Sequence, residues 1–191
     1  MIRHLLNFNI HKYSWVLRAL FYKILFNNIE MPSYLGKPLF ISKIKNIKLK
    51  SNVRIYPGLR VELTSPNAKV LFNKNVSVGQ NLHIVSDKDL KIGENVTISA
   101  NVFIADVENV YDEIDVHLLD QQVKYKETII QKNCFLGYGS VILPGTILGK
   151  NCIVGANSVV KGKFPDYCVI AGNPAKIIKK YSFKVGKWLK K

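Results

Sequence analysis

The chain has 191 residues, of which 48% are hydrophobic, and this is enough for one domain with a filled core. It carries 28 lysine and arginine residues against 13 acidic ones, a net charge of +15, so anionic partners are favoured. Three cysteines, with no CxxC pair and no His/Cys cluster, exclude a disulfide scaffold and predict no metal site. Nucleic acid is not an expected partner, because no recognised binding motif accompanies the charge.

Residues 1–44 are predicted to form a basic N-terminal segment that is helical within 1–30. The stretch WVLRALFYKILF at 15–26 is strongly apolar but carries Arg18 and Lys23. It is too short and too charged for a membrane-spanning helix, which needs about 20 apolar residues.

Two placements of this helix remain open. It lies in a membrane interface with its apolar face down, or it caps one end of a coil and buries the same face on protein. In the first placement, lipid phosphates would meet Arg3, Lys12, Arg18 and Lys23. No signal peptide with a small-residue cleavage site is found, so a cytoplasmic protein is expected, peripheral at the inner face of the membrane in the first placement.

The central part, residues 45–165, repeats in sixes, most regularly over 72–104 and 130–163. A period of six fits neither a helix nor a hairpin meander, but it fits a coil of short strands joined by tight turns. Glycine or asparagine at the corners supplies the backbone freedom that such turns need. The first positions of the hexads, predicted to point at the coil axis, are Phe72, Val78, Ile92, Ile98, Leu136, Ile142, Leu148, Val154 and Val160.

Two segments depart from this period. Residues 105–129 form a polar, acidic loop, and a long excursion from a rigid solenoid usually marks a binding feature. The tail, residues 166–191, opens with turn residues, and a short helix is predicted after Pro174 because proline suits a first helical position.

The hexads, the loop and the segment GANSVVKGKFPDYCVIAGNPAKIIKKY (155–181) together resemble the hexapeptide-repeat acyltransferases. The most similar branch holds galactoside and maltose acetyltransferases and the O-acetyltransferases of bacterial surface polysaccharides. The resemblance covers roughly residues 45–181. It implies an all-β fold, a left-handed parallel β-helix with 18 residues per coil. It further implies a homotrimer that binds acetyl-CoA in the cleft between neighbouring coils and needs no metal.

The resemblance also implies which residues meet the cofactor. Tyr138 and Ala156 match positions that line the groove for the pantetheine arm. Lys161 stands where relatives carry a Thr-Lys pair near the cofactor, with the charge shifted by one residue. Lys176 and Lys179 match basic positions that meet the phosphates, and an ammonium group suits a phosphate as a point charge.

The acceptor side departs from the pattern of the family. Relatives place a histidine at the loop entrance as general base, and the two histidine positions are Val107 and Asn109 here. Valine cannot accept a proton, and loss of a positioned base typically costs 10²–10⁴-fold in rate. His117, in the same loop with acidic neighbours, is the predicted replacement, and His83 is the alternative.

Three carboxylates complete the predicted acceptor side. Asp106 and Glu108 stand at the loop entrance and would serve as bases if desolvated. Asp87 aligns approximately with an acidic acceptor-binding position of relatives.

The leading hypothesis is an acetyl-CoA-dependent O-acetyltransferase acting on a sugar of a surface polysaccharide or its lipid-linked glycan precursor. The first alternative is an N-acetyltransferase of an amino sugar, because an amine is a better nucleophile and needs the lost histidine less. The second is a non-catalytic trimeric relative, motivated by Val107 in place of the usual base.

Overall fold

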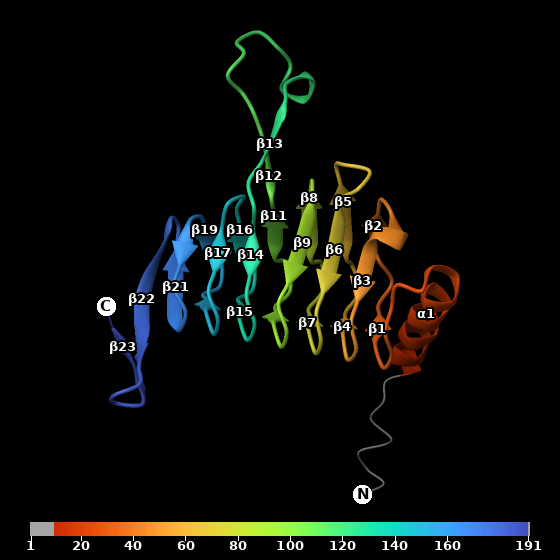
Figure 1. Ribbon diagram of the computed structural model, residues 1–191, viewed down its shortest axis with the longest axis horizontal. Coiled ribbons are helices and arrows are strands. Elements are labelled where there is room, and N and C mark those ends of the chain that lie inside the picture. The colour runs from red at the N-terminus through yellow and green to blue at the C-terminus, as the bar shows by residue number, and fades with distance from the viewer. Residues whose placement is uncertain (1–9, 191) are drawn as a thin grey trace, which may run out of the picture.

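The computed structural model describes residues 10–190, which form a parallel β-helix with a helix, α1 (Ile10–Phe26), at its N-terminal end (Figure 1). Residues 1–9, Arg3 among them, and residue 191 lie outside the described part of the chain. Three parallel sheets form the sides of the coil, and successive strands pass from one sheet to the next. The predicted fold class is confirmed.

The first side consists of β1 (Tyr34–Leu35), β4 (Arg54–Ile55), β7 (Ser77–Val78), β10 (Thr97–Ile98), β15 (Phe135–Leu136), β18 (Ile153–Val154) and β21 (Cys168–Gly172). The second side consists of β2 (Phe40–Ile41), β5 (Arg60–Leu63), β8 (His83–Ser86), β11 (Phe103–Ala105), β16 (Val141–Ile142) and β19 (Val159–Val160). The third side consists of β3 (Ile47–Leu49), β6 (Lys69–Phe72), β9 (Asp89–Ile92), β14 (Ile129–Ile130), β17 (Ile147–Leu148) and β20 (Lys163–Phe164). A 3-10 turn, η2 (Ile44–Asn46), leads into β3.

The core is a set of side-chain columns along the coil axis. On the first side, Val78 pairs with Ile98, Ile98 with Leu136, and Leu136 with Val154. Each of these four side chains is at most 1% exposed. The hexad first positions therefore point inward, as the period predicts.

Asparagine residues make one corner of the coil. Asn75, Asn95, Asn133 and Asn151 all have φ near +60°, a conformation that asparagine tolerates better than most residues. Their side-chain amides also bond to one another, with Asn75 Nδ2 donating to Asn95 Oδ1 at 2.9 Å and Asn95 Nδ2 donating to Asn133 Oδ1 at 3.0 Å. The same residues thus turn the chain and tie successive coils together.

The helix α1 covers the first coil with one of its faces. Ala19 is fully buried, and the Trp15 ring lies 5.8 Å from the Tyr34 ring, centroid to centroid. Arg18 donates a hydrogen bond of 3.0 Å to the Leu35 carbonyl. The capping placement is therefore present, while the opposite helix face stays exposed. Among the residues described, no helix is long and apolar enough to cross a membrane.

The predicted loop at 105–129 is an arm that leaves the coil (Figure 1). It begins with β12 (Val107–Asn109) and returns through β13 (Val123–Tyr125), which pairs with β12 in antiparallel fashion. Its tip contains the 3-10 turn η3 (Leu118–Asp120).

The predicted C-terminal helix is wrong. Residues after Pro174 form β22 (Ala175–Ser182), which pairs antiparallel with β21, and β23 (Lys187–Lys190) pairs with β22. The last coil would otherwise leave the backbone groups of β21 unpaired, and a strand satisfies them where a helix would not. Ile177 lies opposite the buried Ile170 and extends the core column.

The coil also begins before the predicted boundary at residue 45. Strands β1 and β2 already pair with β4 and β5, so the first coil starts within the segment 1–44. At the other end, β21 continues the first side beyond residue 165.

Replacing Ile98 by alanine should lower the free energy of unfolding by about 2–5 kcal/mol, because a buried cavity would open between Val78 and Leu136. Urea denaturation measures this. The control is Leu39→Ala between β1 and β2, where the side chain is 71% exposed and the expected change is within about 0.5 kcal/mol. Equal losses in the two variants would contradict the inward placement of the hexad positions.

Candidate functional site

Two predicted cofactor positions stack directly at the corner between the first and second sides. The backbone amide of Asn157 donates to the Tyr138 carbonyl at 2.8 Å, which places Ala156 one coil beyond Tyr138. The Tyr138 hydroxyl accepts a hydrogen bond of 2.6 Å from Asn101 Nδ2, so the ring lies back along the corner. Tyr138 and Ala156 are both exposed, which leaves their outer surface open to a ligand.

Lys176 and Lys179 lie on β22 and not on a helix. Lys176 is opposite Ala171 and Lys179 is opposite Val169, with a β-bulge between. Residues opposite each other in a sheet share a face, and the extra residue of the bulge restores the alternation. The two lysines therefore share the outer face of the first side, although the predicted helix that would have brought them together does not form.

The remaining predicted cofactor residue, Lys161, lies at the base of the arm beside a predicted acceptor residue. Its Nζ is 3.5 Å from Glu108 Oε2, and Lys126 Nζ bonds to the other carboxylate oxygen. The bond from Lys126, reinforced by the charge of Lys161, lowers the pKa of Glu108 below its usual value. Glu108 is held as a carboxylate in an ion-pair cluster.

Asp106 is a buried support. The residue is 1% exposed, and its carboxylate accepts hydrogen bonds from the Ser86 hydroxyl at 2.7 Å and from the Asp87 amide at 2.8 Å. Burial raises the pKa of Asp106 above its usual value, while these hydrogen bonds act in the opposite direction. Asp106 thereby fixes the corner that carries Asp87, whose own carboxylate accepts from the Thr64 hydroxyl at 2.8 Å.

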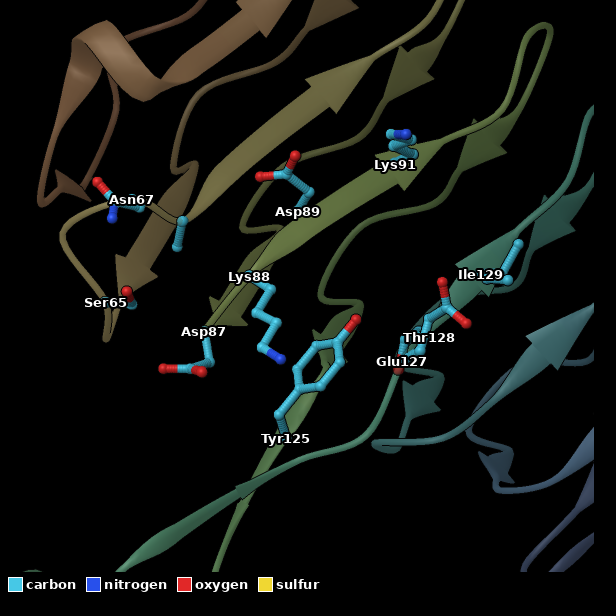
Figure 2. Close-up of a pocket in the computed structure, with 11 residues that line it drawn as sticks. Ser65, Asn67, Asp87, Lys88, Asp89, Lys91, Tyr125, Glu127, Thr128 and Ile129 are labelled. Atoms are coloured by element: carbon cyan, nitrogen blue, oxygen red, sulfur yellow. The ribbon is translucent and has the colours of Figure 1, made fainter.

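A groove of about 710 Å³ opens beside Asp87 at the corner between the second and third sides (Figure 2). Asp89 and Glu127 add two further carboxylates to its wall, and the Lys88 ammonium lies 4.4 Å from the centroid of the Tyr125 ring. Carboxylates accept hydrogen bonds from hydroxyl groups or amines, and a flat ring offers an apolar surface. The groove is thus suited to a polar, hydroxyl-rich acceptor.

Neither candidate histidine lines this groove. His117 is exposed at the tip of the arm, where its Nδ1 accepts a bond of 3.3 Å from the Leu119 amide. His83 lies on the outer face of the second side, with Nε2 2.9 Å from Glu62 Oε1 and its ring against Phe103. Among the contacts described, no carboxylate lies within hydrogen-bond distance of the His117 ring.

The pair of Glu62 and His83 was not found from the sequence. β5 pairs with β8 so that Arg60 lies opposite His83, and Arg60 Nε also bonds to Glu62 Oε1 at 2.6 Å. This pair could not be found by counting residues, because the coil between Glu62 and His83 is longer than 18 residues. A loop at Ser65 to Asn67 lengthens it.

The predicted cofactor positions Tyr138 and Ala156 and the groove beside Asp87 therefore lie apart on the chain. Tyr138 and Ala156 lie at the corner between the first and second sides, whereas Asp87 and the groove lie at the corner between the second and third. The width of the second side separates them, on the order of 15 Å for five residues of strand.

Residues 127–162 match the family model described as bacterial transferase hexapeptide (six repeats). This match covers 36 of the 191 residues, and its strands belong to the three-sided coil, so this part of the chain carries the bacterial transferase hexapeptide repeat. The resemblance predicted from the sequence is confirmed.

Among individual proteins, WbbJ of Escherichia coli (strain K12), a provisionally assigned lipopolysaccharide biosynthesis O-acetyl transferase, is 40% identical over 62 residues. That match spans about a third of this chain and of WbbJ (32% of each). Two solved structures share the fold. AntD, an N-acyltransferase from Bacillus cereus in complex with dTDP and 3-hydroxybutyryl-CoA, has a TM-score of 0.62 and 20% identity, covering 82% of this chain and 81% of AntD. PerB from Caulobacter crescentus, in complex with CoA and GDP-perosamine, has a TM-score of 0.51 and 19% identity, covering 76% of this chain and 56% of PerB.

The Glu108 cluster predicts a pH dependence of stability. Because the folded-state pKa lies below the usual 4.5, the stabilisation is complete above that value and is lost as the pH falls through the folded pKa. At neutral pH, Glu108→Gln should lower the free energy of unfolding by less than about 1 kcal/mol, because the ion pairs with Lys126 and Lys161 are partly exposed to solvent. Urea denaturation at several pH values should show this difference shrinking in acid.

The matched control is Glu94→Gln, the same chemical change at an exposed corner of the coil. A difference between the parent and Glu108→Gln that stays constant down to about pH 3 would contradict the ion-pair explanation.

Proposed function

We propose that the protein transfers an acetyl group from acetyl-CoA to a hydroxyl of a sugar in a surface polysaccharide or its lipid-linked precursor. The observation that carries the proposal is the corner where Tyr138 and Ala156 stack, continued by Lys176 and Lys179 on one face. The groove with Asp87 supplies a second half-site of the right chemistry for a sugar. The local similarity to WbbJ supports an O-acyl acceptor.

N-acylation of an amino sugar is the second candidate. Val107 stands where relatives carry the base, and an amine that is already neutral needs no base for attack. AntD is an N-acyltransferase, and PerB binds the amino-sugar nucleotide GDP-perosamine, which supports this candidate at the level of a shared fold.

We further propose that the protein works as a homotrimer in which the arm reaches a neighbouring protomer. The arm tip exposes Tyr111 by 77%, Ile114 by 82% and Leu119 by 77%, and such large apolar groups are normally covered. A neighbouring protomer that covers them would also receive His117. In this arrangement, His117 of one chain is the general base for the acceptor bound at the next.

The test is a transfer assay with acetyl-CoA and a panel of sugars and amino sugars. His117→Ala should lower turnover on a hydroxyl acceptor by about 10²–10⁴-fold and leave the affinity for CoA nearly unchanged. In this variant, the dependence of turnover on pH should also lose its limb near about pH 6.5. Ala156→Trp should abolish CoA binding by filling the corner.

His83→Ala is the matched control and should leave turnover close to that of the parent. If His83→Ala abolishes transfer and His117→Ala does not, the base is misassigned and the enzyme class stands. If an amine is acetylated and both variants remain active, the N-acyl candidate replaces the O-acyl one. Parent protein that binds no CoA at millimolar concentration would contradict the proposal.

The exposed face of α1 supports the predicted membrane contact of residues 1–30, and we place this contact at the inner face of the membrane. Opposite the buried face, Leu17 is 65% exposed, Phe21 57% and Ile24 74%. These positions recur every three or four residues and form one apolar stripe. Residues 10–29 contain no acidic residue. Of their basic residues, Arg18 bonds to the Leu35 carbonyl and Lys12 lies over the Tyr56 ring, whereas Lys23 is exposed and would meet an anionic lipid surface.

The double variant Phe21→Ser, Ile24→Ser should lose most of its binding to vesicles that contain phosphatidylglycerol, because the apolar area that enters the bilayer is removed. Flotation with the parent protein, in low and high salt, gives the reference. Leu39→Ser is the control, as Leu39 is 71% exposed but lies outside the helix. Unchanged flotation of the double variant would contradict the contact. If the double variant sediments differently from the parent protein instead, the stripe contacts another protomer and not a membrane.

A further inference from the structure

The hairpin of β22 and β23 presents an ordered set of side chains on one face. Lys179 lies opposite Lys190, and Tyr181 lies opposite Trp188. Cross-strand partners share a face, and positions two apart along a strand share it too. These four side chains therefore stand together, and Lys190 and Trp188 lie beyond the segment that carries the family resemblance.

This face looks outward, away from the coil axis. Lys179 is opposite Val169, whose neighbours Cys168 and Ile170 are both fully buried in the core. Because side chains alternate along a strand, Val169 points to the outside, and Lys179 with it. The hairpin face thus continues the outer surface of the first side.

The lysine pair on this face is not neutralised. Like charges directly opposite each other in a sheet are destabilising. Residues 167–191 contain seven lysines and no acidic residue. Within the described range 10–190, no ion pair joins Lys179 or Lys190 to a carboxylate. A bound phosphate would relieve the repulsion and would meet two ammonium groups.

The aromatic pair beside the lysines is held rigidly. The Tyr181 and Trp188 rings lie 5.4 Å apart, centroid to centroid, at 72°. Phe183 packs against Tyr181 at 5.1 Å and against Tyr167 at 4.9 Å, so the rings form one cluster. Tyr181 and Trp188 are each half-buried, which leaves part of each ring open. A flat heterocycle stacks on such a surface with little entropic cost.

This face is continuous with the proposed pantetheine corner. Beside Ala156, a side-chain carbon added at Gly155 would come within 3.0 Å of the Ala171 side chain, so these coils touch closely. Ala171 is opposite Lys176, and Lys179 follows on the same face. From β18 to β23 there are three strand steps, about 14 Å across the strands, and Lys179 lies three residues along β22 from Lys176, roughly 10 Å farther. A chain-like ligand laid over Ala156 therefore leads to the hairpin.

We propose that the outer face of the hairpin binds the nucleotide end of coenzyme A. The adenine stacks on the cluster of Tyr181 and Trp188, and a phosphate lies between Lys179 and Lys190. This inference rests on the proposed function, which places the pantetheine arm at Ala156. It assigns the last strand to donor recognition.

Trp15 and Trp188 are the two tryptophans of the chain, and Trp15 packs at the opposite end of the coil. In a Trp15→Phe background, the fluorescence of Trp188 should change on titration with CoA and with adenosine 3′,5′-bisphosphate, and should not change with pantetheine. Lys190→Glu should weaken CoA binding about tenfold or more, because it reverses a charge next to a phosphate. Lys187→Glu, the same change on the opposite face of β23, should weaken it much less.

Tight CoA binding that is equally affected by Lys190→Glu and Lys187→Glu, with silent Trp188 fluorescence, would overturn the hairpin site and leave acetyl transfer standing. An equal response to dTDP or to inorganic phosphate would overturn the assignment to CoA, since the face would then take phosphate in general. If no acetyl transfer is found while Trp188 still responds selectively to adenosine 3′,5′-bisphosphate and CoA, the proposed function fails and the nucleotide site stands.

Discussion

The coil depends on side chains that point to its axis at every sixth residue. Each of them stacks on the equivalent side chain of the neighbouring coil. Val78, Ile98, Leu136 and Val154 show the requirement, because each contacts the same position one coil away and none has room to point elsewhere. In a strand, a slip of one residue would turn the whole column outward. Extra residues are therefore tolerated only where the chain leaves a strand and can return to the same register.

This constraint explains where the groove beside Asp87 lies. The arm is inserted after β11, yet Ile104 still pairs with Ile142 and Ile130 still pairs with Ile92. The loop between β5 and β6 is inserted at the same corner, between the second and third sides. The groove is lined by both insertions, through Ser65 of the loop and Tyr125 of the arm (Figure 2). A rigid coil thus gathers its variable segments at one corner and forms a concave surface between them.

The parts of the structure that follow from this period could be predicted from the sequence. The inward hexad positions and the arm both come from counting residues, because register leaves one choice of face. Where register no longer decides, sequence reasoning was weaker. The segment after Pro174 has lysines three apart, which fits a helix, but the open end of the coil required a strand. A bulge then gave those lysines the common face that a helix would have given them.

Of the predicted cofactor residues, Tyr138 and Ala156 stack at one corner, whereas Lys161 lies at the other corner beside Glu108. Tyr138 and Ala156 are fixed by coil geometry, so a motif is enough to place them. The acceptor half depends on pairings between coils of unequal length, and the contact between Glu62 and His83 cannot be counted from the sequence. Asp106 shows the same limit. Its position was noticed, but its burial beneath Asp87 becomes visible only when β8 and β11 are seen to pair.

The separation of the two proposed half-sites gives the proposed assembly a chemical purpose. The cofactor corner carries close coil contacts and the asparagine Asn157, and it has no insertion that could close over a ligand within the described residues. The insertions stand at the next corner, beyond the width of the second side. Transfer requires the thioester and the acceptor to come within bonding distance, and a rigid coil cannot bend one corner toward the other. In a threefold arrangement, by contrast, different corners of two chains can face each other across one cleft. The arm, with its apolar tip, is then the part of one chain that reaches the cleft of the next, so the site would be completed by association and not by closure of a single protomer.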